Sequence, residues 1–162
     1  TVQVPAQGRV AVDPRDIVPA ADFATSIVSD RPIIAERAYL SSGDGVYGAL
    51  GYTVRTPSKD ARDWYFAEGN TRSQIQQYFV LFNLSDRDTQ VKGTYFVEGA
   101  GTREQTLALP AGQRLAVRAN DTVDDSLFAA RFSADQNIVV ERTAYLPGGS
   151  GFTTLGSGAG RP

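Results

Sequence analysis

Residues 76–84 read QQYFVLFNL, and this segment decides the fold class of the chain. It is rich in aromatic and β-branched residues, its apolar spacing is close to two, and no helical cap precedes it, so it predicts a β-strand. Residues 85–88 form a polar turn before a second run of the same kind, residues 91–97. The glycines in residues 98–101 predict a hairpin turn into a third strand, residues 102–109, because glycine adopts positive φ at low cost.

Outward from these strands, the rest of the chain carries the same short apolar runs. Turn residues separate the runs at intervals of about 8–12 residues, which is typical of a sandwich or a barrel. No segment predicts a helix, although residues 121–126 have room for one short turn. The fold class is therefore predicted to be all-β. The further strands are expected at residues 9–13, 23–28, 33–40, 46–54, 114–118, 127–132, 138–146 and 152–155.

An internal repeat organises the chain. Residues 4–12 read VPAQGRVAV, and residues 109–117 read LPAGQRLAV at an offset of 105 positions. The same register continues well beyond these segments, so the chain contains two copies of one structural unit. It aligns Phe23 with Phe128, Ile33 with Ile138, Glu36 with Glu141 and Arg37 with Arg142, and one inserted residue later Tyr39 with Tyr145.

The two copies are unequal. Residues 1–57 form the C-terminal half of a unit, and residues 63–162 form a complete unit. Residues 58–62 between them are predicted to be a linker, because they are polar and follow a proline. The Gly-rich tail from residue 156 onward is expected to be mobile.

Half of a sandwich exposes an apolar face and an open edge. Three arrangements would cover them: strands that this piece of the protein does not include, strands added by another chain, or packing of the half on its neighbour. Strand addition between chains would generate a filament, with residues 1–4 or 151–160 as the expected donor.

Composition narrows the function classes. Sixteen Lys and Arg against eighteen Asp and Glu give a net charge of −2, without the basic face that nucleic acid requires. The chain has no Cys and no His, so the usual zinc ligands, thiolate nucleophiles and imidazole bases are missing. No apolar run has the length of a membrane span. The chain also has no Met, so Thr1 is expected to be a processed, proteolytic or boundary end.

Several phrases of the sequence resemble one family of repeats. The segment WYFAEGNT at residues 64–71 resembles the opening of tandem immunoglobulin-like "WYFAEG" repeats in very large secreted bacterial surface proteins. The resemblance covers residues 63–156 in full and residues 4–51 as a half. The family's final segment often carries a His-Asp-Ser phrase, and this chain departs from it with VYG at 46–48 and FTT at 152–154. The other matching phrases are YFVLFN at 78–83, TYFVEGAG at 94–101, LPAGQR at 109–114, IVVERTAY at 138–145 and PIIAERAY at 32–39.

This resemblance implies an immunoglobulin-like β-sandwich in tandem repeats, with the N-terminal copy incomplete. It implies an extracellular structural or adhesive module, a spacer or filament subunit of a bacterial cell-surface assembly, with no catalytic residues and no cofactor. Polymerisation by β-strand complementation is one expected route of assembly. The expected partners are neighbouring repeats of the same protein or further copies of the chain, and neither nucleic acid nor a membrane span is expected.

The residues expected to matter most are packing residues of the sandwich core. A second group is a Glu-Arg ion pair that recurs in both copies, where a salt bridge or a backbone contact would close one end of the sandwich. The packing residues are Trp64, Phe66, Tyr78, Phe79, Tyr95, Phe128, Ile138 and Tyr145, and the repeated ion pair comprises Glu36, Arg37, Glu141 and Arg142.

Three other patterns suggest binding or catalysis. The aromatic run at residues 64–66 could stack on a sugar, which makes a carbohydrate-binding module with a polysaccharide ligand the alternative function. The oxygen-rich loop with Asn120, Asp121, Asp124 and Asp125 is a weak calcium candidate, since its spacing is not that of an EF-hand. Paired carboxylates would be the groups of a glycosidase, but no spacing fixes two of them at the required separation. The carboxylates considered for this role are Glu68, Glu98 and Glu141.

The sequence also contains two glycosylation triplets, which begin at Asn83 and Asn120.

Overall fold

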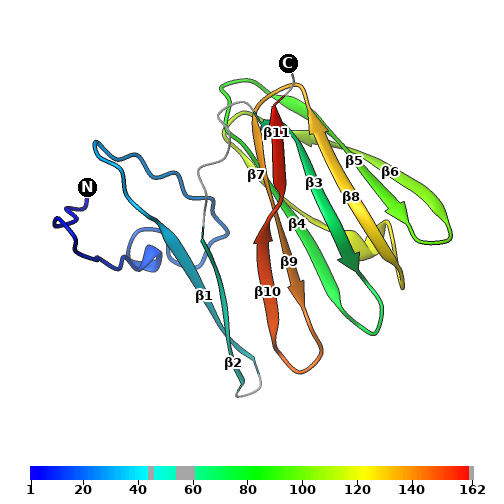
Figure 1. Cartoon of the computed structure of the whole chain (residues 1–162), viewed down its shortest axis with the longest axis horizontal. Helices are drawn as coiled ribbons and strands as arrows, with labels where there is room; N and C mark the ends of the chain where they lie inside the picture. The colour runs from blue at the N-terminus through cyan, green and yellow to red at the C-terminus, as the bar shows by residue number, and fades with distance from the viewer. Residues whose placement is uncertain (44–45, 54–60, 161–162) are drawn as a thin grey trace.

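The structure is a computed structural model that describes residues 1–43, 46–53 and 61–160 (Figure 1). Its described residues form strands, turns and two short 3₁₀ turns, and every described strand pairing is antiparallel. The predicted all-β sandwich is confirmed. The strands are β1 (Glu36–Gly43), β2 (Val46–Thr53), β3 (Ala61–Asn70), β4 (Gln76–Asn83), β5 (Thr89–Val97), β6 (Gly101–Leu109), β7 (Arg114–Arg118), β8 (Leu127–Ala134), β9 (Ile138–Tyr145), β10 (Gly151–Leu155) and β11 (Ser157–Gly160).

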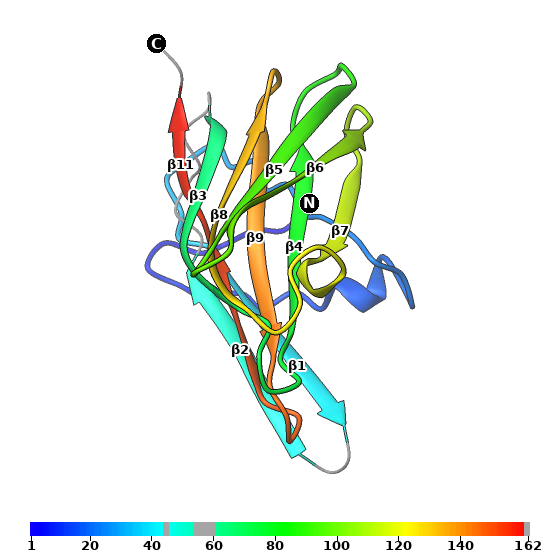
Figure 2. The same cartoon turned by 90° about the vertical axis from the view of Figure 1, so that its right-hand side faces the viewer.

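Two sheets face each other in the complete unit, as the turned view shows (Figure 2). One sheet has the strand order β11-β3-β8-β5-β6, and the other has the order β10-β9-β4-β7. Strands β1 and β2 form a separate antiparallel hairpin. The final strand of the unit divides between the sheets, because β10 pairs with β9 and β11 pairs with β3.

The core between the sheets is aromatic. On β4 the burial alternates with period two, and Gln77, Phe79, Leu81 and Asn83 point inward. Phe79 lies at the centre of a cluster of rings, with its centroid 4.7 Å from that of Phe132. Edge contacts of this kind add stability beyond the area that each ring buries. The other rings of the cluster are Phe66, Tyr95 and Phe128.

Two predictions about strands are wrong. Residues 9–13 and 23–28 form no strand, although their equivalents in the second copy are β7 and β8. In the complete unit β7 pairs with β4, and β8 lies between β3 and β5. Within the described residues no such neighbours lie beside residues 1–35, so their backbone groups have no ladder to join.

The tail and the boundary also differ from the expectation. The tail expected to be mobile contains β11, which pairs with the edge of β3. Ala61 and Arg62, expected in the linker, already belong to β3. The rest of the expected linker, residues 58–60, lies outside the described residues.

The backbone of the first copy repeats the turns of the second. Gly8 N donates to Pro5 O at 3.0 Å, as Gln113 N donates to Pro110 O at 3.1 Å. Gln7 has a φ of 55° where its equivalent Gly112 has 64°. The repeat read from the sequence is therefore also a repeat of local structure, even where the strands are not formed.

The short 3₁₀ turns agree as well. Pro14–Asp16 and Ala119–Asp121 lie at the same offset of 105 as the sequence repeat. Their preceding residues, Asp13 and Arg118, have φ/ψ of −87°/112° and −81°/117°. Residues 1–35 thus keep the turn geometry of the second half of a unit.

Candidate functional site

Trp64, the proposed centre of a sugar-binding platform, is buried in the core. Its side chain is 1% exposed, and its Nε1 donates a hydrogen bond of 2.8 Å to the carbonyl of Ile138 on the opposite sheet. A buried indole offers no face for a sugar ring, so the platform prediction is wrong for this residue. The neighbouring Tyr65 is exposed, and the guanidinium of Arg131 lies 5.7 Å from the centre of its ring.

The predicted packing residues divide into two groups. Trp64, Phe66, Phe79, Tyr95, Phe128 and Ile138 are buried in the core. Tyr78 and Tyr145 are not core residues: they lie on the outer face of the four-stranded sheet, and their rings contact each other edge to face at 5.9 Å. Sequence alternation gives the two faces of a strand but does not say which one is covered.

The three candidate carboxylates contact three different arginines. Glu141 Oε2 lies 3.1 Å from Arg37 Nη2, Glu98 lies 3.8 Å from Arg72, and Glu68 lies 3.3 Å from Arg142. Each carboxylate is thus engaged by its own arginine, whereas the two carboxyl groups of a glycosidase are both directed at one glycosidic bond.

The predicted repeated ion pair takes a different form in the structure. Arg37 of the first copy contacts Glu141 of the second, so the pair joins the copies. Arg142, the equivalent of Arg37, contacts the carbonyl and the carboxylate of Glu68 at the end of β3. Neighbouring residues on a strand point to opposite faces, which is why Glu141 and Arg142 serve different surfaces. Glu36 lies at the start of β1.

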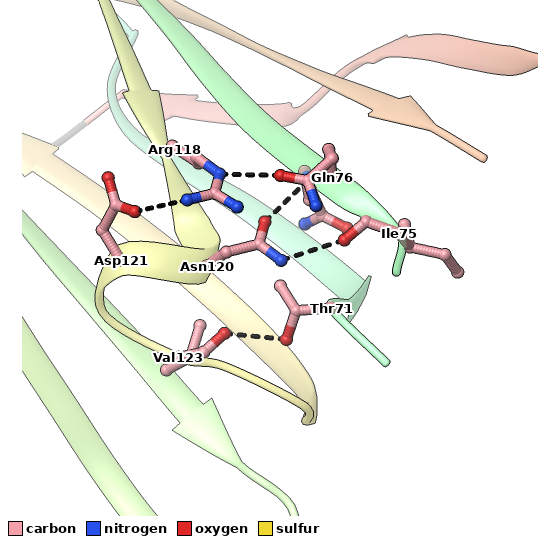
Figure 3. A network of polar contacts seen from close by, with 8 residues as sticks. Thr71, Ile75, Gln76, Arg118, Asn120, Asp121 and Val123 are labelled. Carbon is pink, nitrogen blue, oxygen red and sulfur yellow. Dashed lines mark hydrogen bonds and ion pairs between the residues drawn. The ribbon is translucent and has the colours of Figure 1, made fainter. Parts of the chain in front are cut away.

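The loop predicted as a calcium candidate is part of a hydrogen-bond network (Figure 3). Asn120 accepts a bond of 3.0 Å from the backbone N–H of Gln77 and donates one of 2.9 Å to the carbonyl of Ile75. Asp121 forms an ion pair of 2.9 Å with Arg118, whose Nε also donates to Gln76. Two of the four proposed ligands are therefore committed to protein partners.

No cation site emerges elsewhere in the part of the chain that the structure describes. There, no group of three or more Asp, Glu, His or Cys side chains comes together. Asp124 and Asp125 lie on the exposed turn after the network, and Asp125 has a φ of 44°. The calcium prediction therefore has no support from geometry.

Both glycosylation triplets begin with a buried asparagine. Asn83 is fully buried and donates to the carbonyls of Arg87, Leu109 and Pro110 at 2.7, 3.1 and 3.2 Å. Asn120 is nearly as buried and belongs to the network above. These side chains hold the turns of the fold and are not accessible for modification in the folded state.

A hollow of 460 Å³ lies at one end of the five-stranded sheet and is open to solvent. Its lining includes Phe96, Phe128 and the irregular part of β3 between Phe66 and Gly69. The two carboxylates at its rim, Glu68 and Glu98, are the ones already paired with arginines. The hollow therefore does not resemble an enclosed ligand site, because it is open to solvent and its carboxylates are already paired.

The strongest candidate site is the contact between the two copies. Strand β2 lies alongside β10, the edge strand of the four-stranded sheet, without joining that sheet (Figure 1). Among the described residues, two ion pairs connect the copies: Arg37 with Glu141, and Arg114 with Asp22 at 3.2 Å. Such pairs fix orientation more than they add stability, because both are partly open to solvent.

The second copy contributes the outer face of its four-stranded sheet to this contact. Glu141 pairs in register with Val80, and Arg114 pairs with Phe82, so all four side chains point away from the core. We call this surface, formed by the outward side chains of β7, β4 and β9, the outer face. It is the surface of the complete unit on which residues of the first copy lie.

Comparison with known proteins supports the fold class. No protein-family model matches the chain, and no curated protein is found as a relative. The crystal structure of Thermotoga maritima 1070 is similar, with a TM-score of 0.57 and 14% identity over 62% of this chain and 96% of that one. At this identity the likeness shows the β-sandwich alone. The Anabaena sensory rhodopsin transducer aligns at 26% identity with a TM-score of 0.47, over 54% of this chain and all of its own.

Among the described residues, no helix is long and apolar enough to cross a membrane.

Proposed function

We propose that the chain is a structural repeat module, an extracellular spacer or stalk unit in an adhesive bacterial cell-surface assembly. One observation carries the structural part of the proposal: ion pairs between the first copy and the outer face of the second orient the two copies relative to each other. A module of this kind works by repeating a stable core and fixing the orientation of its neighbour.

The distribution of polar groups supports a structural role over a catalytic one. The carboxylates that could serve as acid and base contact separate arginines. The buried amides of Asn83 and Asn120 hold backbone groups of turns. These groups stabilise the ends of the sandwich, and the two carboxylates at the rim of the open hollow, Glu68 and Glu98, are paired with separate arginines.

The extracellular part of the proposal is supported by the resemblance of residues 64–71 and the later phrases to repeats of secreted surface proteins. It is tested on intact cells of the source organism. Antibodies raised against folded residues 61–160 should label intact cells, and external trypsin should remove the label. Labelling that appears only after permeabilisation would contradict a surface location.

Self-association is the second measurable part of the proposal. A filament subunit would give a concentration-dependent series of oligomers in size-exclusion chromatography and regular filaments in negative-stain electron microscopy. A spacer within one long chain would give a monomer at every concentration. The spacer form is the one we propose, because the contact between copies is made within a single chain.

A further inference from the structure

Residues 4–35 expose apolar side chains at positions that are buried in the second copy. The comparison is made residue by residue at the offset of 105 that the turns share. Burial of apolar surface is the main favourable term in folding, so these side chains mark a surface that is built to be covered. Val4 is 49% exposed and Leu109 is 1%, Ile27 is 62% and Phe132 is 0%, and Ile33 is 46% and Ile138 is 0%.

The second copy shows what covers these positions. Phe132 packs against Phe66 of β3 and Phe79 of β4, and the carbonyl of Ile138 accepts the bond from Trp64. Strand β8 lies between β3 and β5, and β7 pairs with β4. The cover is therefore the first half of the unit, which runs from β3 to the penultimate residue of β6. We call this segment, residues 61–108, the front half.

We infer that residues 4–43 and 46–53 are an acceptor for another front half of the same repeat type, which completes a second sandwich ahead of the one described. The turns at residues 5–8 and 14–16 already have the geometry of their equivalents at 110–113 and 119–121, so little of the acceptor has to rearrange there. Residues 22–29 would become a strand equivalent to β8 once neighbours are present on both sides.

A second copy of this chain is not the expected occupant. Its own front half is already paired with its own β7, β8 and β9, so it offers no free front half. The occupant is a front half whose own second half is the acceptor, as in a tandem array. This inference rests on the repeat organisation of the proposed function. It adds which segment of a neighbouring repeat covers the exposed apolar side chains.

One position shows how the acceptor differs from the second copy. Asp13 lies where the second copy has Arg118, which contacts the amide oxygen of Gln76. Asp13 forms an ion pair with Arg15 at 2.6 Å, and both are open to solvent. A glutamine in a front half could turn its amide and donate to Asp13, so residues 61–105 of this chain are a suitable probe.

The test places a second copy of residues 61–105 directly before Thr1, which keeps the offset of 105. Hydrogen–deuterium exchange is then followed at residues 9–13 and 22–29 in the fused chain and in the unmodified chain. We expect exchange at these amides to slow by at least about 100-fold, as for strands within a cooperative unit. The control is the same fusion with the added copies of Trp64, Phe66 and Phe79 changed to Ser, which should exchange as the unmodified chain does.

Unchanged exchange in the intact fusion would overturn the inference. Protection that already exists in the unmodified chain and rises with its concentration would overturn it too, by showing that a second copy is the occupant. Ile27→Asp and Ile33→Asp provide a test that does not depend on the fusion being soluble. In the unmodified chain each should shift Tm by less than about 1 °C, and a larger loss would show that these residues are already covered. The labelling of intact cells is independent of all these outcomes.

Discussion

At the scale of single residues, the fold depends on buried side chains such as Trp64 and Asn83, whose polar atoms form hydrogen bonds. Trp64 combines a buried indole with a hydrogen bond to the opposite sheet. Asn83 joins three carbonyls and also accepts bonds from the backbone and side chain of Ser85 at 3.0 and 2.7 Å. A buried polar group costs stability unless it is bonded, so these contacts specify the fold as well as stabilise it.

Substitution of Trp64 should be among the most damaging single changes. We expect Trp64→Ala to lower the free energy of unfolding by about 3–5 kcal/mol, because it leaves a cavity in the core and an unbonded carbonyl at Ile138. Tyr65→Ala, at the next position of β3, is the matched control and should cost less than about 1 kcal/mol. Urea unfolding followed by far-ultraviolet circular dichroism measures both. Equal losses for the two variants would contradict the burial of Trp64.

Tyr95 should make stability fall at alkaline pH. Burial raises the pKa of Tyr95 to about 12 from its ordinary value of 10, although Gln105 donates a hydrogen bond to its hydroxyl oxygen. The unfolded chain releases this proton first, so the contribution is fully present below about pH 10 and is lost as the pH rises to about 12. The expected loss is about 2–3 kcal/mol, at roughly 1.4 kcal/mol for each pKa unit.

Urea unfolding at pH 9 and pH 12 checks this prediction, with Tyr95→Phe as the control. The phenylalanine variant has no phenol to ionise, so its stability should fall less over the same pH range. If the two proteins lose stability in parallel, Tyr95 is not the group responsible.

At the scale of the element, the last strand changes sheets at Gly156. Its backbone N–H donates to Val140 at 3.2 Å, and a Cβ at this position would lie 2.6 Å from Cζ of Phe66. β10 therefore stays with the four-stranded sheet while β11 reaches β3. The crossing closes the sandwich along one edge (Figure 1).

Gly156→Ala should loosen this closure. The added methyl group must displace the Phe66 ring, so we expect a loss of about 1–3 kcal/mol in the free energy of unfolding and faster amide exchange in β11. Ser157→Ala is the control, since that side chain is exposed. Chemical denaturation and hydrogen exchange measure the two effects, and a Gly156→Ala protein as stable as Ser157→Ala would show that the ring has room to move.

The elements differ in how well the sequence predicts them. β4 and β5 were predictable because their aromatic and β-branched residues alternate. β11 reads SGAG and has no such pattern; it forms because the edge of β3 offers free backbone groups and Gly158 lets the strand approach Trp64 closely. Propensity alone carries no information on a neighbour of this kind.

The candidate site was less predictable than the fold. Arg37 and Glu141 are 104 positions apart, and each was expected within its own copy. Whether Trp64 faces the core or solvent depends on the opposite sheet, which periodicity does not include. Residues 22–29 have the composition of a strand, yet their state depends on neighbours that lie elsewhere.

At the scale of the whole molecule, the chain contains one complete sandwich unit and the second half of another. Each complete unit has its own aromatic core, and the outer face receives the neighbouring copy through the pairs at Glu141 and Arg114. Charges of this kind weaken with salt, so the orientation of neighbouring copies should be better defined at low ionic strength. Under the proposed function, the property that the module supplies is the length of an array.

The most direct test is small-angle X-ray scattering on this chain with zero, one or two further copies of residues 56–162 appended in tandem. We predict a maximum dimension that grows by a constant increment with each added copy, with the scattering of a folded, elongated particle. A maximum dimension that stays constant, or scattering typical of units joined by flexible chain, would contradict a structural array.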